Sequence, residues 1–179
     1  MVAIVMSLLV ALSSHGAATT NHAATSQKTA SAVRSTNFPI RGVVVAGKSI
    51  GTITLGMTQA QVRAHWGRSY EVCSFCKKTV TWFYEYKGGE PLGAAVKFLK
   101  GKVVSVFTLG SPAGWGLKGL MMGDPVTNVY NLFGNTGSAQ CIGYDALTVK
   151  IGASTMSFYA AAGVIYGYAL TGPSESVCQ

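Results

Sequence analysis

The chain has 179 residues, of which 49% are hydrophobic and only 11% charged, against the charged fraction of about 25% that is typical of soluble domains. Such a chain is able to bury a core, so it is not expected to be disordered throughout, and its length fits one ordinary domain or two small ones. The 22 glycines favour a turn-rich β protein. The net charge of +8 would suit anionic wall polymers, lipid headgroups or nucleic acid, but the lysines are dispersed along the chain, and we favour a solubilising role for them.

The N-terminal part of the chain is typical of a secretory leader. An apolar run from Val2 to Leu12 is too short to span a bilayer as a helix, and Gly16 and Ala18 are small residues at the −3 and −1 positions of a cleavage after Ala18. We predict a signal peptide over residues 1–18 and a disordered Ala/Ser/Thr-rich spacer over residues 19–37. Because no Lys or Arg precedes the run, an uncleaved interfacial anchor is the alternative. No transmembrane span is expected in the mature chain.

A first helix is predicted from residue 59 to residue 66. Thr58 and Gln61 have the spacing of a capping box, in which each side chain bonds the other residue's backbone N–H. Val62 and Trp66 lie four residues apart on one face, and Gly67 is a typical helix end. These residues predict a short amphipathic helix.

The same pattern returns in altered form later in the chain. Asp124 is the expected N-cap and Pro125 the first helical residue, where its missing N–H costs little. Val129, Phe133 and Gly134 lie 67 residues after their counterparts in the first copy. We interpret this as an internal duplication.

Runs of β-branched and aromatic residues bounded by glycine turns follow each predicted helix. They span residues 79–86, 93–99 and 102–109 after the first helix, and 144–151, 155–160 and 164–171 after the second. The predicted fold class is α+β, with two tandem repeats packed side by side, each a helix followed by a three-stranded antiparallel meander. The repeats are placed at residues 38–110 and 111–179.

The segment Leu55-Gly56-Met57-Thr58, with Val62 and Gly67, resembles the helix signature of BamE-type (SmpA/OmlA) outer-membrane assembly lipoproteins. The tandem arrangement resembles the secreted β-lactamase inhibitory protein family. These resemblances imply a two-repeat fold that binds another protein. The inhibitor family inserts a hairpin with an acidic tip into an enzyme, and its nearest match here is the turn at residues 88–91, which contains Glu90. The chain lacks the lipobox cysteine of the assembly lipoproteins.

Four cysteines, all beyond the leader, indicate disulfides in an oxidising compartment. Three pairings are possible, and we favour Cys73–Cys76 with Cys141–Cys178. A redox role for Cys73 and Cys76 is the alternative, although such a site needs a helix N-terminus and this pair follows a helix. A zinc site would need a second such pair or paired histidines, so no metal is expected.

Residues that would support catalysis are sparse. His65 is the only histidine beyond the spacer, the carboxylates are isolated in the sequence, and no dinucleotide fingerprint is present. We therefore predict no enzymatic activity and no cofactor. Aromatic and basic side chains on the strands are the candidate binding residues, and with Glu90 the set is Trp82, Tyr84, Tyr86, Glu90 and Lys97.

The predicted function is a secreted, non-catalytic protein-binding or inhibitor-like module whose partner is unknown. One alternative is an envelope-associated scaffold that binds anionic wall polymers, and another is a small thiol-redox protein. The expected partner is a protein or an anionic envelope polymer, and neither a nucleotide cofactor nor nucleic acid is expected. The expected location is secreted or in the cell envelope.

Overall fold

The computed structural model describes residues 41–76, 78–85, 93–110, 114–117 and 119–179. The chain divides into two compact units, residues 1–33 and 34–179, and the described residues belong to the second. The predicted signal peptide and spacer, residues 1–18 and 19–37, lie outside the described residues and stay predictions.

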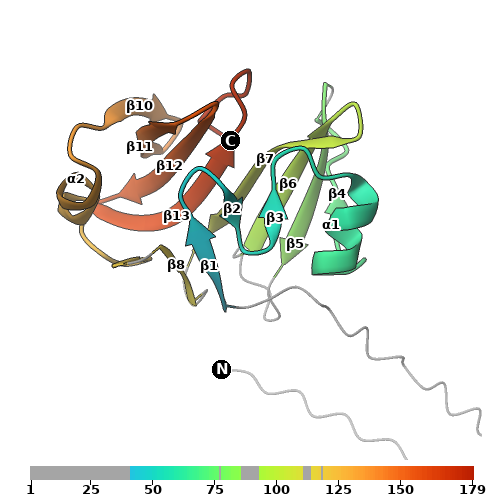
Figure 1. Ribbon diagram of the computed structural model, residues 1–179, viewed down its shortest axis with the longest axis horizontal. Helices are drawn as coiled ribbons and strands as arrows, with labels where there is room; N and C mark the ends of the chain where they lie inside the picture. The colour runs from blue at the N-terminus through green and yellow to red at the C-terminus, as the bar shows by residue number, and fades with distance from the viewer. Residues whose placement is uncertain (1–40, 77, 86–92, 111–113, 118) are drawn as a thin grey trace, which may run out of the picture. The chain divides into compact units, whose positions relative to one another are not determined.

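Two β-sheets make up most of the described structure (Figure 1). The larger has eight strands in the order β10-β11-β12-β13-β7-β6-β5-β4, and the smaller has five in the order β3-β2-β1-β8-β9. The eight strands are β4 (Glu71–Val72), β5 (Val80–Glu85), β6 (Gly93–Leu99), β7 (Lys102–Leu109), β10 (Gly137–Cys141), β11 (Tyr144–Ile151), β12 (Ser154–Ala161) and β13 (Val164–Thr171). The five are β1 (Arg41–Val45), β2 (Ser49–Ile50), β3 (Ile53–Thr54), β8 (Gly114–Leu117) and β9 (Leu120–Met121).

Helix α1 (Gln59–Trp66) forms where the sequence predicts it. The Gln61 backbone N–H donates to the Thr58 Oγ1 atom at 3.2 Å, and the Thr58 N–H donates to the Gln61 side-chain oxygen at 2.8 Å. This capping box satisfies two N–H groups that a helix start otherwise leaves without a partner.

Helix α2 (Thr127–Phe133) begins later than predicted, and Asp124 is not its cap. A turn over residues 122–124 precedes Pro125, which pairs with Val164 in an isolated antiparallel bridge, so Pro125 is not part of the helix. Asp124 instead accepts a hydrogen bond from the Met121 backbone N–H at 2.8 Å, in the turn before the helix. The predicted cap is therefore wrong because the strand pairing takes precedence over the capping motif.

The main core lies on one face of the eight-stranded sheet, which we call the inner face. Val62 and Trp66 of α1 and Val129 of α2 are completely buried there, together with residues of both sheets. The Trp66 and Tyr84 rings meet edge to face, with their centroids 5.3 Å apart. Aromatic burial of this kind supplies a large part of the hydrophobic stabilisation.

The predicted fold class is wrong at the level of architecture. The protein is mostly β, with two helices of 8 and 7 residues among its described parts, and it is not a pair of helix-plus-meander repeats. Strand β13 pairs with β7 from Gly167↔Leu109 to Thr171↔Ser105, so the strands after both helices belong to one sheet. The five-stranded sheet was not predicted, because its strands are too short to show periodicity. The proposed boundary between residues 110 and 111 stays untested.

The contact between β13 and β7 leads to a first prediction. Gly167 lies opposite Leu109, and a Cβ atom there would approach the Thr108 carbonyl oxygen to 2.6 Å, closer than real Cβ contacts. We expect Gly167→Ala to lower the free energy of unfolding by roughly 3 kcal/mol in urea titrations. The matched control is Gly101→Ala, whose Cβ would meet no atom within 4 Å and which costs about 1 kcal/mol for its positive φ. Equal losses in the two variants would contradict the close approach.

Buried tyrosines predict a loss of stability at alkaline pH. Burial raises the pKa of the phenols of Tyr84, Tyr159 and Tyr168 well above their ordinary value. Above pH about 10 the unfolded chain releases protons that the folded chain retains, so the free energy of unfolding falls with rising pH. The expected slope is about 1.4 kcal/mol per pH unit for each such tyrosine, measured by urea unfolding from pH 8 to 11. Tyr168→Phe should reduce this slope, and a stability that stays constant from pH 9 to 11 would contradict the assignment.

Candidate functional site

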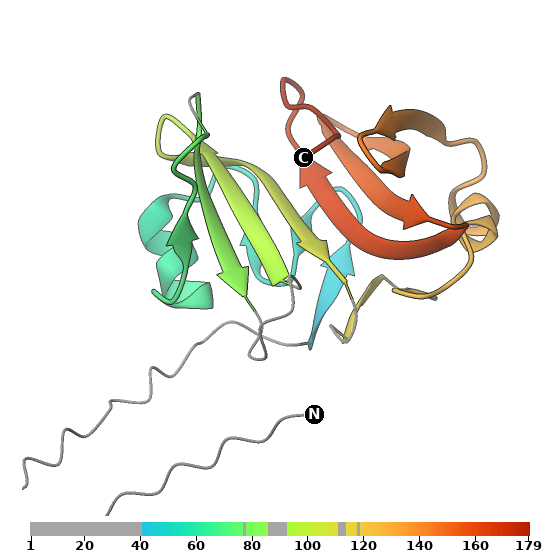
Figure 2. The same cartoon turned by 180° about the vertical axis from the view of Figure 1, so that it is seen from behind.

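The eight-stranded sheet has a second face, which we call the outer face. Because side chains alternate along a strand, the strand pairing places Phe83, Ala95, Phe107 and Ala169 side by side on it. These residues belong to a smaller apolar cluster that also includes Tyr159 and Leu109. No helix lies over this face among the described residues, and the C-terminal segment crosses it (Figure 2).

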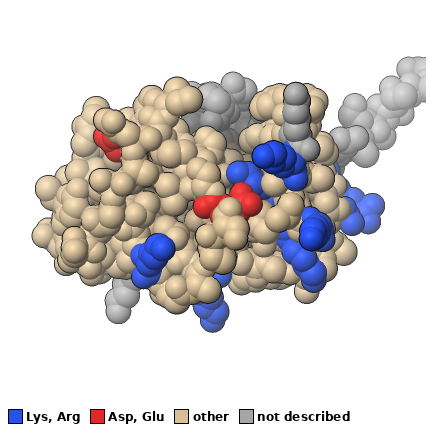
Figure 3. All heavy atoms as spheres, turned by 90° about the horizontal axis from the view of Figure 1, so that it is seen from above, with Lys and Arg blue, Asp and Glu red and all other residues tan. Residues whose placement is uncertain are grey.

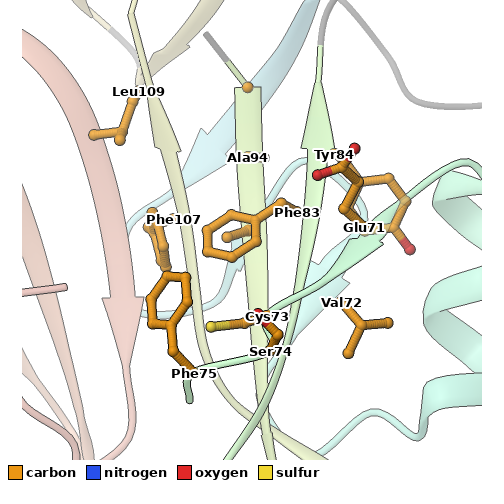
Figure 4. Close-up of a pocket in the computed structure, with 12 residues that line it drawn as sticks. Glu71, Val72, Cys73, Ser74, Phe75, Phe83, Tyr84, Ala94, Phe107 and Leu109 are labelled. Atoms are coloured by element: carbon orange, nitrogen blue, oxygen red, sulfur yellow. The ribbon is translucent and has the colours of Figure 1, made fainter. Parts of the chain in front are cut away.

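A pocket of about 430 Å³ lies on the outer face over β5, β6 and β7. Phe83, Ala95, Phe107 and Leu109 line it from the sheet, and the segment from Glu71 to Phe75 lines it from the side (Figure 4). Apolar and aromatic side chains predominate, with Glu71 as the charged residue of the lining. Pockets of this size and composition are typical of binding sites.

The Cys73–Cys76 disulfide closes a short loop beside this pocket. The two Cα atoms are 5.6 Å apart, and the loop holds Phe75 at the pocket with 78% of the residue exposed to solvent. Aromatic residues, Phe among them, are enriched at protein interfaces, which makes Phe75 a candidate binding residue. The disulfide limits the freedom of the loop, so burial of Phe75 against another surface would cost little conformational entropy.

Both disulfides that the sequence predicts, Cys73–Cys76 and Cys141–Cys178, are present. The first follows β4 and precedes β5, so it does not lie at the helix N-terminus that a thioredoxin-like site requires. The second joins the last residue of β10 to the C-terminal segment. Both therefore hold a non-sheet segment against the sheet.

The candidate binding residues from the sequence are not brought together on one surface. Trp82 and Tyr84 lie on the inner face, where 3% and 1% of their surfaces are exposed, and Lys97 lies on the outer face. Tyr86 and Glu90 lie outside the described residues. The binding role of this set stays a prediction. Sequence reasoning missed Phe75, although a large aromatic between two cysteines is a readable signal.

Basic side chains are less dispersed than the sequence suggests. Ten of the fourteen Lys and Arg residues lie within residues 38–110, whereas residues 111–179 hold two. The pairings Val80↔Phe98 and Leu99↔Lys102 bring Lys78, Lys100 and Lys102 to one end of the sheet, and all three are exposed. Figure 3 shows more Lys and Arg on one half of the face that it presents. We call these three residues the basic rim.

Comparison with known proteins shows similarity in fold alone. Neither a protein-family model nor a curated protein matches the sequence. The structure is similar to an extracellular protein containing an SCP domain from Bacillus anthracis, with a TM-score of 0.50, 12% identity, and coverage of 72% of this chain and 50% of that chain. It is also similar to a DUF4309 family protein from Bacillus subtilis, with a TM-score of 0.52, 13% identity, and coverage of 72% of this chain and 84% of that chain. The chain thus spans about half the length of the Bacillus anthracis protein.

These findings correct the resemblance drawn from the sequence. The two solved structures are described as an SCP-domain protein and a DUF4309 family protein, so they do not support the resemblance to the β-lactamase inhibitory protein family or to the BamE-type lipoproteins. The Gly-Met-Thr helix signature is a short local motif, and such a motif does not determine how the strands pair. Among the described residues, no helix is long and apolar enough to cross a membrane.

The two disulfides predict different losses of stability. Cys73–Cys76 closes a loop with a sequence separation of 3, and Cys141–Cys178 closes one with a separation of 37. Because a longer loop loses more entropy on closure in the unfolded chain, we expect about 2 kcal/mol of lost stability for Cys73→Ser/Cys76→Ser and about 4 kcal/mol for Cys141→Ser/Cys178→Ser. Urea unfolding of both double variants measures this. A larger loss for the first pair would contradict the expected order.

Proposed function

We propose that this chain is an extracytoplasmic, non-catalytic module that binds a partner protein through the pocket on its outer face. The observation that carries the proposal is the exposed Phe75, held at an apolar pocket by the Cys73–Cys76 disulfide. Phe75 protrudes beside a recess, and a partner has to supply both a side chain for the recess and a hollow for Phe75. A small ligand fills a recess but cannot bury a protruding ring, whereas a protein surface does both.

The expected complex has an aromatic centre. Phe75, Phe83 and Phe107 contribute rings to one site, and aromatic residues at the centre of an interface supply much of the binding free energy. Leu109 and Ala95 add apolar area around them. The partner segment is therefore expected to carry at least one large apolar side chain.

Three observations support the extracytoplasmic location. Both disulfides are the kind of bond that persists in oxidising compartments. The Bacillus anthracis protein with a similar fold is described as extracellular. The apolar run at residues 2–12 is typical of a secretory leader.

The basic rim favours a second candidate function, an envelope scaffold that binds anionic wall polymers. Lys78, Lys100 and Lys102 are exposed together, and binding through them would weaken steeply as the salt concentration rises. Binding through the pocket is mainly hydrophobic and would change little with salt. Salt dependence therefore separates the two candidates.

The test is capture of secreted and envelope proteins on the immobilised chain at 0.1 M and 0.5 M salt. Loss of a central aromatic side chain typically costs ~2 kcal/mol or more, so Phe75→Ser should weaken capture of a specific partner roughly 30-fold. The matched control is Ile142→Ser, which also removes a fully exposed apolar side chain but lies outside this pocket. Equal capture by the two variants would rule out the pocket as the binding site. Capture that disappears at 0.5 M salt, or on Lys100→Glu/Lys102→Glu, would favour the scaffold instead.

A further inference from the structure

The segment from Gly172 to Gln179 lies across the outer face, and Figure 2 shows the end of the chain in front of the sheet. At its start, the Gly172 N–H donates to the Val104 carbonyl oxygen at 2.8 Å. Further along, the Tyr159 hydroxyl donates to the Val177 carbonyl oxygen at 2.9 Å. We call residues 172–179 the tail.

The far end of the tail is held by Tyr144 and by a disulfide. The Tyr144 hydroxyl donates to the Gln179 carbonyl oxygen at 3.1 Å and accepts from the Gln179 N–H at 2.9 Å. The Cys141–Cys178 disulfide then fixes the tail covalently. Most of these hydrogen bonds reach the backbone of the tail, which begins with a turn in which the Glu175 N–H donates to the Gly172 carbonyl oxygen at 3.2 Å.

One cation on the sheet recognises side chains of the tail. The Lys97 ammonium lies 3.6 Å from a Glu175 carboxylate oxygen and donates to the Gln179 side-chain oxygen at 2.8 Å. The side chains of Lys97 and Glu175 are mostly buried, at 18% and 15% exposed. A mostly buried ammonium needs an anion beside it, so this position selects a carboxylate.

The same surface has polar groups that the tail does not use. The hydroxyls of Thr81, Ser105 and Ser157 have no hydrogen-bond partner among the described residues, and these residues are between 0% and 2% exposed. The register places Thr81 and Ser105 on either side of Lys97, and Ser157 two residues before Tyr159 on the same face. The hydroxyls of Ser105 and Ser157 therefore lie between Lys97 and Tyr159, which hold the tail, and Thr81 lies on the far side of Lys97. Buried hydroxyls usually have partners, and a different polypeptide would be able to supply them.

We propose that this surface, made by Lys97, Ser105, Ser157, Tyr159 and Tyr144, is a second peptide-binding site. We call it the tail seat. Its ligand is a segment of a partner protein with a carboxylate opposite Lys97, and the chain's own tail occupies the seat until that ligand replaces it. This inference does not depend on the pocket beside Phe75.

Exchange requires that Cys141–Cys178 opens, because the disulfide ties the tail at its far end. Both cysteines are partly exposed, so a reductant has access to them. A dithiol reductant supplies the two electrons and two protons that convert this disulfide into two thiols, and the dithiol itself becomes a disulfide. The tail then stays attached at its start and competes as a tethered ligand.

The experiment uses the full chain and a labelled peptide with the sequence of residues 172–179, in which Ser replaces the cysteine. The tethered tail competes with the labelled peptide at an effective concentration of about 1 mM. The tail must therefore also lose its affinity for the tail seat if the peptide is to bind. The variant Cys141→Ser/Cys178→Ser/Glu175→Lys achieves this by removing the disulfide and reversing the charge that faces Lys97. Fluorescence anisotropy then measures binding of the peptide.

We expect this triple variant to bind the peptide at least 10-fold more tightly than the oxidised wild-type chain does. A peptide with Gln in place of its glutamate should bind at least 10-fold more weakly, and addition of Lys97→Glu to the variant should abolish binding of the original peptide. Absence of binding to the triple variant, or equal binding of the two peptides, would overturn the proposal.

A second measurement covers the case in which the triple variant does not fold. Hydrogen exchange of the wild-type chain is measured with and without a dithiol. With the dithiol, the amides of residues 172–179 should exchange faster, while those of β12 and β13 stay protected. Cys73→Ser/Cys76→Ser is the matched control, because it removes a disulfide without freeing the tail. In this variant without a dithiol, where Cys141–Cys178 is intact, the amides of the tail should remain protected. A tail that stays protected after reduction of Cys141–Cys178 would also overturn the proposal.

Discussion

The pairing of β13 with β7 is the constraint on which the other features depend. It joins the strands that follow the two helices into one sheet, through hydrogen bonds from Gly167↔Leu109 to Thr171↔Ser105. The approach is close at Gly167, where the Thr108 carbonyl oxygen leaves no room for a Cβ atom. A strand at the edge of a sheet has N–H and C=O groups that are free to pair with another strand. Here β7 and β13, which would each be an edge strand without the other, pair together. The result is a sheet with the main core on its inner face and a smaller buried apolar cluster on its outer face.

The division into two faces determines what each aromatic residue does. Trp82 and Phe83 are neighbours in the sequence, yet Trp82 stacks on Tyr70 in the core, with ring centroids 4.0 Å apart, while Phe83 lines the pocket on the outer face. Alternation along the strand puts them on opposite sides. The inner face stabilises the fold with large buried rings, whereas the outer face carries a smaller buried apolar cluster, and the exposed Phe75 lies on a loop beside it.

Both disulfides act on the outer face. Cys73–Cys76 shapes the loop that presents Phe75, and Cys141–Cys178 ties the tail to β10 at one edge of the sheet. Each thus fixes a segment that has few backbone hydrogen bonds of its own. The fold of this chain is similar to that of an extracellular protein with only 12% sequence identity. This similarity is consistent with a fold that depends more on strand pairing than on particular side chains.

Local signals in the sequence determined the local structure of this protein. The Thr58/Gln61 pair and the Val62/Trp66 spacing predicted α1, and the β-branched runs predicted the long strands, because both depend on residues close in the sequence. The cysteine pattern indicated both disulfides. The tertiary structure decided that β13 pairs with β7 and that five short strands form a second sheet. It also decided that Trp82 is buried and Phe75 exposed, and that the tail crosses the outer face. These outcomes depend on contacts between residues far apart in the chain, and periodicity shows that a strand has two faces without showing which one will be covered.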